Sequence, residues 1–359
     1  MTWVLEGFAG PGGLSEGMTM LGVDDSLGIE LNADACATAE AAGHRRSRVD
    51  IRTLDPGDFA YAELWASAPP CQTYSDGGQR SGVAERAKVA AGIVAVSDGK
   101  ERPADFADPR TSLVLETLEF AVQLPNVHVV IAEQVPPVRP IWIEMCAELA
   151  AHHRFESVQV VTVRCDDLGV ANRRPRVFLI ATRDYTPDLS ALPTRARWSA
   201  GRFGPGPVEL GANLSTPFPA APSMAEVLSW PKGIKVNTRG ARTTPGGNLF
   251  SADGVAPSLT HSTRTWYRTD LGSEDGRLTA AEAGLLQGFR RDYPWHAGGS
   301  RTSQFQRIAD TVSPIVGAAV VGAALGLPWW QDVVHERLEE LYGQRAARPH
   351  QLDLLAEVA

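Results

Sequence analysis

Short apolar stretches alternate with stretches of helical periodicity through the first half of the chain. The apolar stretches are bounded by glycine, proline or polar residues, which is typical of strands, whereas apolar residues that recur every three or four positions indicate helices. Strands that alternate with helices predict an α/β fold on a mostly parallel, doubly wound sheet. We expect strands at residues 2–8, 24–31, 64–68, 127–132, 158–164 and 177–181, and helices at residues 14–21, 33–42, 111–123 and 142–152.

The pattern changes near Asp184. The residues that follow, up to about 222, are rich in Pro, Gly, Ser and Arg, and residues 238–265 are polar and glycine-rich. This composition favours a smaller, loop-rich domain with short strands. Helical periodicity returns at 278–287 and at 315–325, and the second of these helices is apolar enough to pack back on the first sheet. We expect one domain at residues 1–190 that residues 305–345 complete, a second domain at residues 191–304, and a tail at residues 346–359.

One connection in the first domain is unusually long. Residues 78–108 contain small residues, mixed charges and one apolar patch at 89–96. Connections of this length are commonly functional lids or disordered segments, and we expect a mobile lid here.

Length and cysteine usage limit the class of protein. A chain of 359 residues suggests two domains, or one large domain with an insertion. No apolar run reaches the roughly 18–20 residues that span a bilayer, and the N-terminus lacks the basic start of a signal peptide. We therefore expect a cytoplasmic protein with no membrane partner. The cysteines show no CxxC spacing, so we expect neither a metal site nor a disulfide framework. They are Cys36, Cys71, Cys146 and Cys165.

Charge is unevenly distributed along the chain. The net charge is −8, yet residues 232–307 contain eleven Lys and Arg against six Asp and Glu. A basic segment on an acidic protein suits a surface that faces phosphates, although ordinary charge fluctuation is the alternative.

A glycine-rich loop stands where the first expected strand turns into the first helix. Gly10, Gly12 and Gly13 would let the backbone approach a ligand closely. Glu30 ends the second expected strand and can accept hydrogen bonds from ribose hydroxyls, and Asp50 can accept from an adenine amino group. The spacing is not GxGxxG, so a nucleoside without a pyrophosphate fits better, and S-adenosylmethionine is the ligand we expect. A plain tight turn is the alternative.

Three further groups stand at expected strand ends. Cys71 follows two prolines at the end of a strand, where it could act as a nucleophile or serve as a small buried hydrophobe. Glu133 follows four apolar residues, so we expect a raised pKa and a carboxyl that shares a proton with a ring nitrogen. A capping or ion-paired glutamate is the alternative. Arg174 and Arg176 suit recognition of phosphate or carbonyl groups, or form a solvated basic turn.

Together these elements resemble the cytosine-C5 DNA methyltransferase family, over about residues 4–325. The order of the motifs matches: a glycine-rich loop, Pro-Pro-Cys-Gln, Glu-x-Val and Arg-x-Arg, with later segments that match the family's recognition border and final motif. The matching segments are residues 8–13, 69–72, 108–113, 133–135, 174–176, 277–293 and 309–314.

The resemblance implies a fold and a set of residue roles. It implies a Rossmann-like, S-adenosylmethionine-dependent catalytic domain and a smaller target-recognition domain. Cys71 would attack C6 of a flipped-out cytosine and form a covalent adduct, while Glu133 would hold and protonate N3. Arg176 would hold the base and Arg174 would support the site. The cofactor pocket would comprise Phe8, Gly10, Gly12, Gly13, Glu30, Asp50, Ile51, Pro70, Leu113, Asp310 and Val312.

The resemblance also implies partners. We expect a monomer that acts on double-stranded DNA, as a restriction-linked, orphan or phage-borne enzyme, with a cognate restriction enzyme as partner in the first case. Arginines of the recognition region would read guanine edges or touch phosphates only. The candidate DNA-binding residues are Gln72, Ser75, Arg239, Arg242, Arg264 and Arg268.

Three departures from the family pattern bear on these expectations. Gln134 replaces the usual Asn, although the longer amide could still brace the loop, and Ala171-Asn172 replaces Pro-Gln. Asp310 stands where the family usually has Asn, which is either benign or a sign of an altered cosubstrate. Two competing hypotheses stay open: the same chemistry on RNA, such as tRNA, and a silent protein that binds nucleic acid or S-adenosylmethionine.

Overall fold

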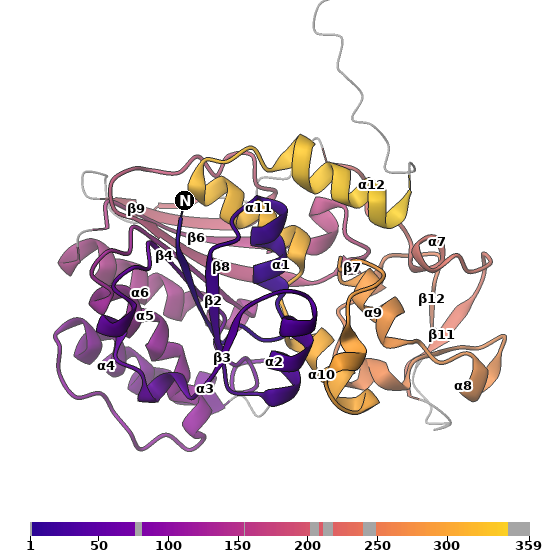
Figure 1. The fold of residues 1–359 in the computed structure, drawn as a ribbon, viewed down its shortest axis with the longest axis horizontal. Helices are drawn as coiled ribbons and strands as arrows, with labels where there is room; N and C mark the ends of the chain where they lie inside the picture. Colours follow the sequence, from indigo (N-terminus) through magenta and orange to yellow (C-terminus); the bar gives the residue numbers. More distant parts are fainter. Residues whose placement is uncertain are drawn as a thin grey trace, which may run out of the picture.

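The computed structural model describes residues 2–75, 81–153, 155–201, 208–210, 218–239 and 249–343. Within them, the largest sheet has nine strands in the order β10-β9-β6-β8-β5-β4-β1-β2-β3 (Figure 1). Five neighbouring strands run parallel: β1 (Val4–Gly7), β2 (Ser26–Glu30), β3 (Arg46–Arg48), β4 (Leu64–Ser67) and β5 (Val129–Gln134). Antiparallel pairing continues the sheet through β8 (Pro175–Thr182), β6 (Ser157–Arg164), β9 (Thr194–Gly201) and β10 (Val208–Leu210).

Helices cover both faces of this sheet, as the alternating sequence pattern predicts. Successive strand residues point to opposite faces, so Leu64 packs into one apolar cluster and Trp65 into the other. The cluster on Leu64's side includes residues of α1 and α11, and the cluster on Trp65's side includes residues of α4, α5 and α6. The doubly wound prediction is therefore confirmed. These helices are α1 (Gly13–Met20), α4 (Arg86–Ser97), α5 (Leu115–Gln123), α6 (Arg139–His152) and α11 (Pro314–Leu325).

Helix α11 returns to the first half of the chain, as its apolar sequence predicts. It packs against α1 and reaches β5 (Figure 1). Residues 301–325 are long and apolar enough to cross a membrane by composition alone, but 89% of the most apolar window is buried inside the protein. This burial is that of a core helix.

The long connection after Cys71 is not an irregular loop, which corrects the expectation of a lid over residues 78–108. It forms α3 (Ser81–Ala84) and α4, and α4 packs on α5 and α6. Val89, Ile93 and Val96 of α4 are buried, because this spacing places all three on one face of the helix. Residues 78–80 lie outside the described part of the chain.

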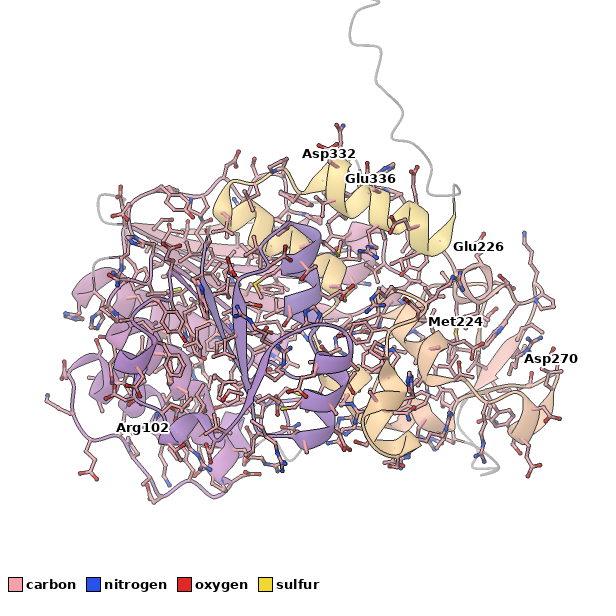
Figure 2. All side chains as sticks on the ribbon, in the orientation of Figure 1. Arg102, Met224, Glu226, Asp270, Asp332 and Glu336 are labelled. Atoms are coloured by element: carbon pink, nitrogen blue, oxygen red, sulfur yellow. The ribbon has the colours of Figure 1, made fainter. Side chains whose placement is uncertain are left out.

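The later part of the chain forms a smaller unit with short strands (Figure 1). Its three-stranded sheet has the order β12-β11-β14, and a separate two-residue pairing joins β13 to β7. Asp270 lies at the outer edge of this unit (Figure 2). Strands β9 and β10 follow residue 190 yet belong to the large sheet, and the boundary at 190/191 stays a prediction. The strands are β7 (Asn172–Arg173), β11 (Lys235–Asn237), β12 (Leu249–Ser251), β13 (Ala256–Pro257) and β14 (Tyr267–Arg268).

Helices surround these short strands and connect them to the large sheet. The buried residues Trp266 and Leu286 belong to the same apolar cluster as α11, so the two units share a core. The remaining helices are α2 (Ala33–Ala41), α7 (Met224–Leu228), α8 (Gly272–Asp275), α9 (Ala280–Leu286), α10 (Arg301–Asp310) and α12 (Glu336–Tyr342), with a 3-10 turn, η6 (His261–Thr265), beside α10.

Candidate active site

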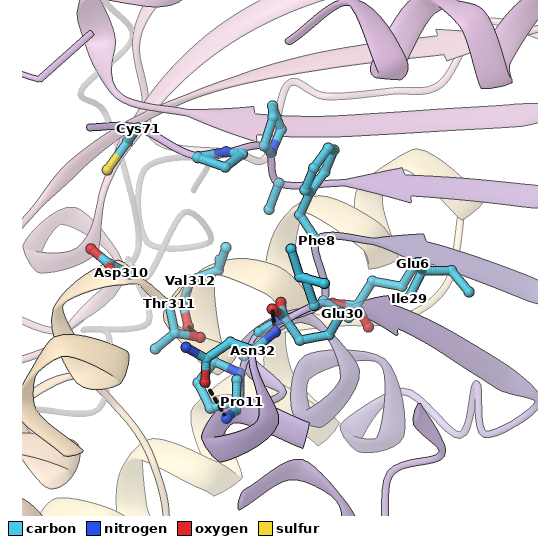
Figure 3. Close-up of a pocket in the computed structure, with 18 of the residues that line it drawn as sticks. Glu6, Phe8, Pro11, Ile29, Glu30, Asn32, Cys71, Asp310, Thr311 and Val312 are labelled. Carbon is cyan, nitrogen blue, oxygen red and sulfur yellow. Dashed lines mark hydrogen bonds between the residues drawn. The ribbon is translucent and has the colours of Figure 1, made fainter. Parts of the chain in front are cut away.

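A cavity of about 280 Å³ opens at the carboxyl ends of the parallel strands (Figure 3). This edge is the usual ligand site of an open α/β sheet. Segments far apart in the sequence line it, from the loop after β1 to the turn between α10 and α11. The predicted residues that line the cavity are Phe8, Gly10, Gly13, Glu30, Asp50, Ile51, Pro70, Cys71, Gln72, Leu113, Glu133, Arg176, Asp310 and Val312.

The glycine loop takes its shape from positive φ angles. Gly10 has φ 55° and Gly12 has φ 106°, a conformation that side chains other than glycine rarely adopt. A Cβ on Gly13 would lie 2.2 Å from the carbonyl oxygen of Val312, so only glycine allows this close approach. Gly12 does not line the cavity; it caps α1 on the side of Tyr293, whose hydroxyl donates to the carbonyl of Pro11.

Two carboxylates stand at the ends of β2 and β3. The two oxygens of Glu30 accept hydrogen bonds from the backbone nitrogens of Gly10, at 2.8 Å, and Asn32, at 2.6 Å. Asp50 accepts from Arg52, and these hydrogen bonds hold the pKa of Asp50 below its ordinary value. An ionised carboxylate has about four lone-pair sites, so Glu30 keeps acceptor capacity for a ligand. Asp50 receives four hydrogen bonds from Arg52 and would exchange one of them for a bond to a ligand.

The donor set and the walls of the cavity fit a nucleoside. Glu30 and Asp50 supply acceptors suited to hydroxyl and amino groups, and the side chains of Phe8, Ile51 and Leu113 supply apolar walls. Phe8 itself has φ 55°, an uncommon conformation for a side chain of this size. The residues present are therefore consistent with S-adenosylmethionine. Among the described residues, no cluster of His, Cys, Asp and Glu suits a metal ion.

Cys71 is held by hydrogen bonds on both sides of it. Its carbonyl oxygen accepts from the backbone nitrogens of Tyr74 and Ser75, each at 2.9 Å. On the other side, the amide nitrogen of Gln134 donates to the carbonyl of Pro69 at 2.7 Å. The longer amide at position 134 does brace the loop, as expected. Ser75 does not line the cavity, whereas Gln72 does.

The thiol of Cys71 is protonated in this environment at neutral pH. Burial raises the pKa of Cys71 to about 11; the charge of Asp310 adds to this, and those of Arg176 and Arg174 oppose it. Figure 3 shows the Asp310 carboxylate turned toward the Cys71 side chain. A thiolate therefore needs a change in this environment, or a base, when Cys71 reacts.

Glu133 and Arg176 form a buried ion pair beside Cys71. Arg176 Nε lies 2.7 Å from Glu133 Oε1, and both side chains are nearly inaccessible to solvent. Burial raises the pKa of Glu133, as its apolar strand predicted, while Arg176 and Arg174 act in the opposite direction. A carboxyl of this kind can exchange a proton with a bound base.

Arg174 lies behind the cavity and does not line it. Its guanidinium donates to the carbonyl oxygens of Leu259 at 3.3 Å, Ala309 at 2.5 Å and Thr311 at 3.1 Å. Burial lowers the pKa of Arg174 to about 10, with Arg176 acting in the same direction. The side chain thus fixes the backbone on both sides of Asp310.

Asp310 has a partner that the sequence did not reveal. His261 Nε2 lies 2.7 Å from Asp310 Oδ1, and this hydrogen bond raises the pKa of His261. The two residues are 49 positions apart, and no spacing motif connects them. Helix α10 also places Ser303, Gln306 and Arg307 at the cavity, and sequence analysis missed these residues as well.

The candidate DNA-binding arginines differ in their surroundings. Arg239 is exposed at the end of β11, while Arg264 donates to the carbonyl of His261 at 2.7 Å. Arg268 pairs with Asp270 and lies 5.1 Å from the ring centre of Trp230. Arg242 lies outside the described residues. None of the described three lines the cavity.

Comparisons with known proteins agree with the motifs. A family model described as C-5 cytosine-specific DNA methylase matches residues 3–96. The Type II methyltransferase M.DdeI of Desulfomicrobium norvegicum is 27% identical over 197 residues, which is 51% of this chain and 41% of that relative. The match thus spans less than half of that relative's length.

Solved structures share the fold at low sequence identity. A DNMT2 mutant of Spodoptera frugiperda superposes with a TM-score of 0.63 and 14% identity, over 90% of this chain and 100% of that one. The Dnmt2 methyltransferase of S. pombe gives a TM-score of 0.59 and 13% identity, over 91% and 99%. By its sequence matches the chain is similar to the C-5 cytosine-specific DNA methylases, as its motifs predicted.

Proposed function

We propose that this protein is an S-adenosylmethionine-dependent methyltransferase that acts on C5 of cytosine in double-stranded DNA. One observation carries the proposal: the Cys71 thiol and the Glu133–Arg176 pair line the same cavity as the Glu30 and Asp50 carboxylates. A nucleophile and a proton donor for a pyrimidine ring therefore stand at one end of a site that fits a nucleoside. A protein that only binds nucleic acid or cofactor has no need of this nucleophile.

The cofactor would be held by the loop after β1 and by the ends of β2 and β3. Glu30 and Asp50 would accept hydrogen bonds from it, and Phe8, Ile51 and Leu113 would pack against it. Gly10 and Gly13 would let the backbone approach it closely. When bound, S-adenosylmethionine supplies an electrophilic methyl group on a sulfonium.

The chain's own residues would activate the base. The Cys71 thiol gives its proton to solvent as the sulfur attacks C6 of a cytosine that has left the stack. The S–C6 bond forms, and the C5=C6 electron pair becomes available at C5. Glu133 donates its proton to N3 and stabilises the charge that enters the ring, and Arg176 holds Glu133 in place. After C5 gains the methyl group, loss of the C5 proton restores the double bond and expels the sulfur, which regains a proton.

DNA is the substrate that the sequence favours over RNA. The matching family model and the related type II methyltransferase both support it. The excess of positive charge over residues 232–307 suits either nucleic acid. The same relative supports a restriction–modification setting, in which a monomeric enzyme would have a cognate restriction enzyme as partner.

Nucleoside mass spectrometry of DNA from a host that expresses the protein tests the proposal. We expect 5-methylcytosine with the intact protein and none with Cys71→Ser, a nearly isosteric variant whose folding a thermal melt verifies. Methylation confined to RNA would favour RNA as the substrate, and a heavier C5-modified cytosine would favour an altered cosubstrate. Absence of modified cytosine from both nucleic acids would refute the enzyme.

A further inference from the structure

Asp310 and His261 connect the Cys71 end of the cavity to solvent. Asp310 lines the cavity, and its charge acts on Cys71. His261 Nε2 binds one oxygen of that carboxylate at 2.7 Å. The exposed fractions of the two side chains are 45% for His261 and 30% for Asp310. The pair therefore lies between the cavity that Cys71 lines and solvent.

The backbone around this pair is held by one buried side chain. Arg174 donates to the carbonyls of Ala309 and Thr311, on either side of Asp310, and to that of Leu259, two residues before His261. Arg264 also donates to the carbonyl of His261. Both members of the pair are thus positioned by hydrogen bonds rather than by chance proximity.

Several charged groups surround the pair. Arg174 and Arg264 act on His261 and oppose its protonation, whereas Asp310 favours it. On the cavity side, the groups that act on Cys71 are Asp310, Arg176, Arg174 and Glu133. Because Glu133 already pairs with Arg176, Asp310 is the carboxylate at this end of the cavity that is free of an arginine partner among the described ion pairs.

The proposed reaction needs a group that accepts the proton from C5 of the cytosine. Each turnover breaks one C5–H bond, and the electron pair of that bond re-forms C5=C6 while the S–C6 pair returns to Cys71. Glu133 serves N3 in this scheme and is therefore not the acceptor for C5. An Asn, which is usual at position 310 in the family, has no basic atom at neutral pH, whereas a carboxylate has one.

We propose that Asp310 accepts the C5 proton and that His261 passes it to solvent, a step that rests on the proposed function. The proton moves from C5 to the free oxygen of Asp310. It then leaves through His261, because the exposed ring exchanges protons with water at its second nitrogen. Asp310 is then a catalytic residue and His261 a positioning residue that restores the carboxylate.

Two substrates separate this step from the earlier ones. DNA with 5-fluorocytosine cannot lose its C5 substituent as a cation, so it accumulates the Cys71 adduct before elimination. DNA with C5-tritiated cytosine reports loss of the C5 hydrogen in a single turnover. We expect Asp310→Asn to trap the fluorinated DNA at least as fast as the unaltered protein does, because loss of that charge favours the Cys71 thiolate. We expect the same variant to release tritium about 100-fold more slowly at pH 7, within the range of general-base catalysis.

The pH profile distinguishes a proton relay from a structural contact. The pKa of His261 is raised above its ordinary value near 6.5. In the unaltered protein, the rate of tritium release should rise as the pH passes this pKa, because only the neutral ring can accept the proton from Asp310. His261→Gln keeps a hydrogen-bond donor for Asp310 but does not titrate, so this rise should disappear and release should slow about 10-fold. Asp98→Asn, which alters an exposed carboxylate paired with Lys100, is the matched control.

The results that would contradict the proton relay differ from those that would contradict the proposed function. Tritium release by Asp310→Asn at the unaltered rate and with an unaltered pH profile would overturn the inference, as would an equal loss of adduct trapping. If the unaltered protein traps no fluorinated DNA at all, the proposed function itself fails. Thermal melts of both variants exclude unfolding as the cause of a slow reaction.

Discussion

The pKa of the Cys71 thiol is set by burial and by charges of both signs. Burial and the Asp310 charge disfavour the thiolate, and the charges of Arg176 and Arg174 favour it, with a pKa of about 11 as the result. At pH 7 roughly one Cys71 in ten thousand would carry a thiolate. In the proposed reaction, attack of Cys71 on the base must therefore be coupled to transfer of the thiol proton.

This balance predicts the alkylation behaviour of Cys71. Its rate with iodoacetamide should rise about tenfold per pH unit from pH 7 to 10, because only the thiolate reacts. Asp310→Asn removes a charge that raises the pKa of Cys71, so its alkylation should be faster at any pH in this range. Peptide mass spectrometry measures the rate, with the fully buried Cys146 as an internal control. A plateau below pH 9 would contradict the raised pKa.

Arg174 should stabilise the folded protein through its hydrogen bonds to three backbone carbonyls. Arg174→Met would remove a buried donor from three backbone carbonyls, of which, among the described residues, only that of Thr311 keeps a second side-chain donor, Gln287 Nε2. We therefore expect the free energy of unfolding to fall by about 2–4 kcal/mol. Arg173 is exposed, so Arg173→Met is the matched control and should change stability little. Urea denaturation measures both variants, and an equal effect of the two would contradict the role of Arg174.

At the scale of elements, the contact between α1 and α11 holds the glycine loop (residues 8–13) in position. A Cβ on Gly17 of α1 would lie 2.7 Å from the backbone nitrogen of Ala318 and 2.7 Å from the carbonyl oxygen of Pro314. The turn before α11 carries Val312, whose carbonyl lies against Gly13. The spacing of these two helices therefore sets the position of the cofactor loop.

Gly17→Ala should consequently force the two helices apart. We expect it to lower the free energy of unfolding by about 1–3 kcal/mol, as overpacking does, and to weaken cofactor binding. Gly254→Ala is the control, because a Cβ there meets no atom closer than 3.9 Å. Calorimetry measures melting and binding of each variant. Equal melting temperatures for the two variants would contradict the close approach.

Local sequence pattern determines the elements that were predicted correctly, whereas tertiary contacts determine those that were missed. Strand β5 begins with four apolar residues and β6 contains four valines, so local pattern is sufficient to predict them. Helix α4 was missed because Val89, Ile93 and Val96 are separated by Ala, Gly and a further Val, so the segment forms one apolar patch without helical periodicity. Strand β9 lies in a segment rich in Arg and Pro, and only its pairing with β6 makes it a strand.

At the scale of the whole molecule, the motifs predicted which residues meet, but not how they are paired. The cavity unites Cys71, Glu133 and Arg176 as the family resemblance implied. The contact between His261 and Asp310 depends on the packing of η6 against α10, and it has no signature in the sequence. The tertiary fold alone supplies that part of the site.

The uneven charge of the molecule also predicts how it binds nucleic acid. The protein is acidic overall, so we expect the proposed DNA contacts to come from the basic segment at residues 232–307. Affinity should then fall steeply with salt, because binding releases counterions from DNA. With about four phosphate contacts, affinity should fall on the order of 100-fold between 50 and 200 mM salt.

The surroundings of two arginines sharpen this prediction. Arg239 is exposed, whereas Arg268 already pairs with Asp270 and lies over Trp230. Arg239→Ala should therefore reduce the magnitude of the slope of log affinity against log salt by about one, the value for one phosphate contact. Arg268→Ala should reduce this slope less, because Asp270 offsets the charge of Arg268. Fluorescence anisotropy with labelled duplex DNA over a salt series measures both slopes. A salt-independent affinity would contradict DNA as the substrate, and equal slopes for the two variants would place Arg268 on a phosphate despite its partner.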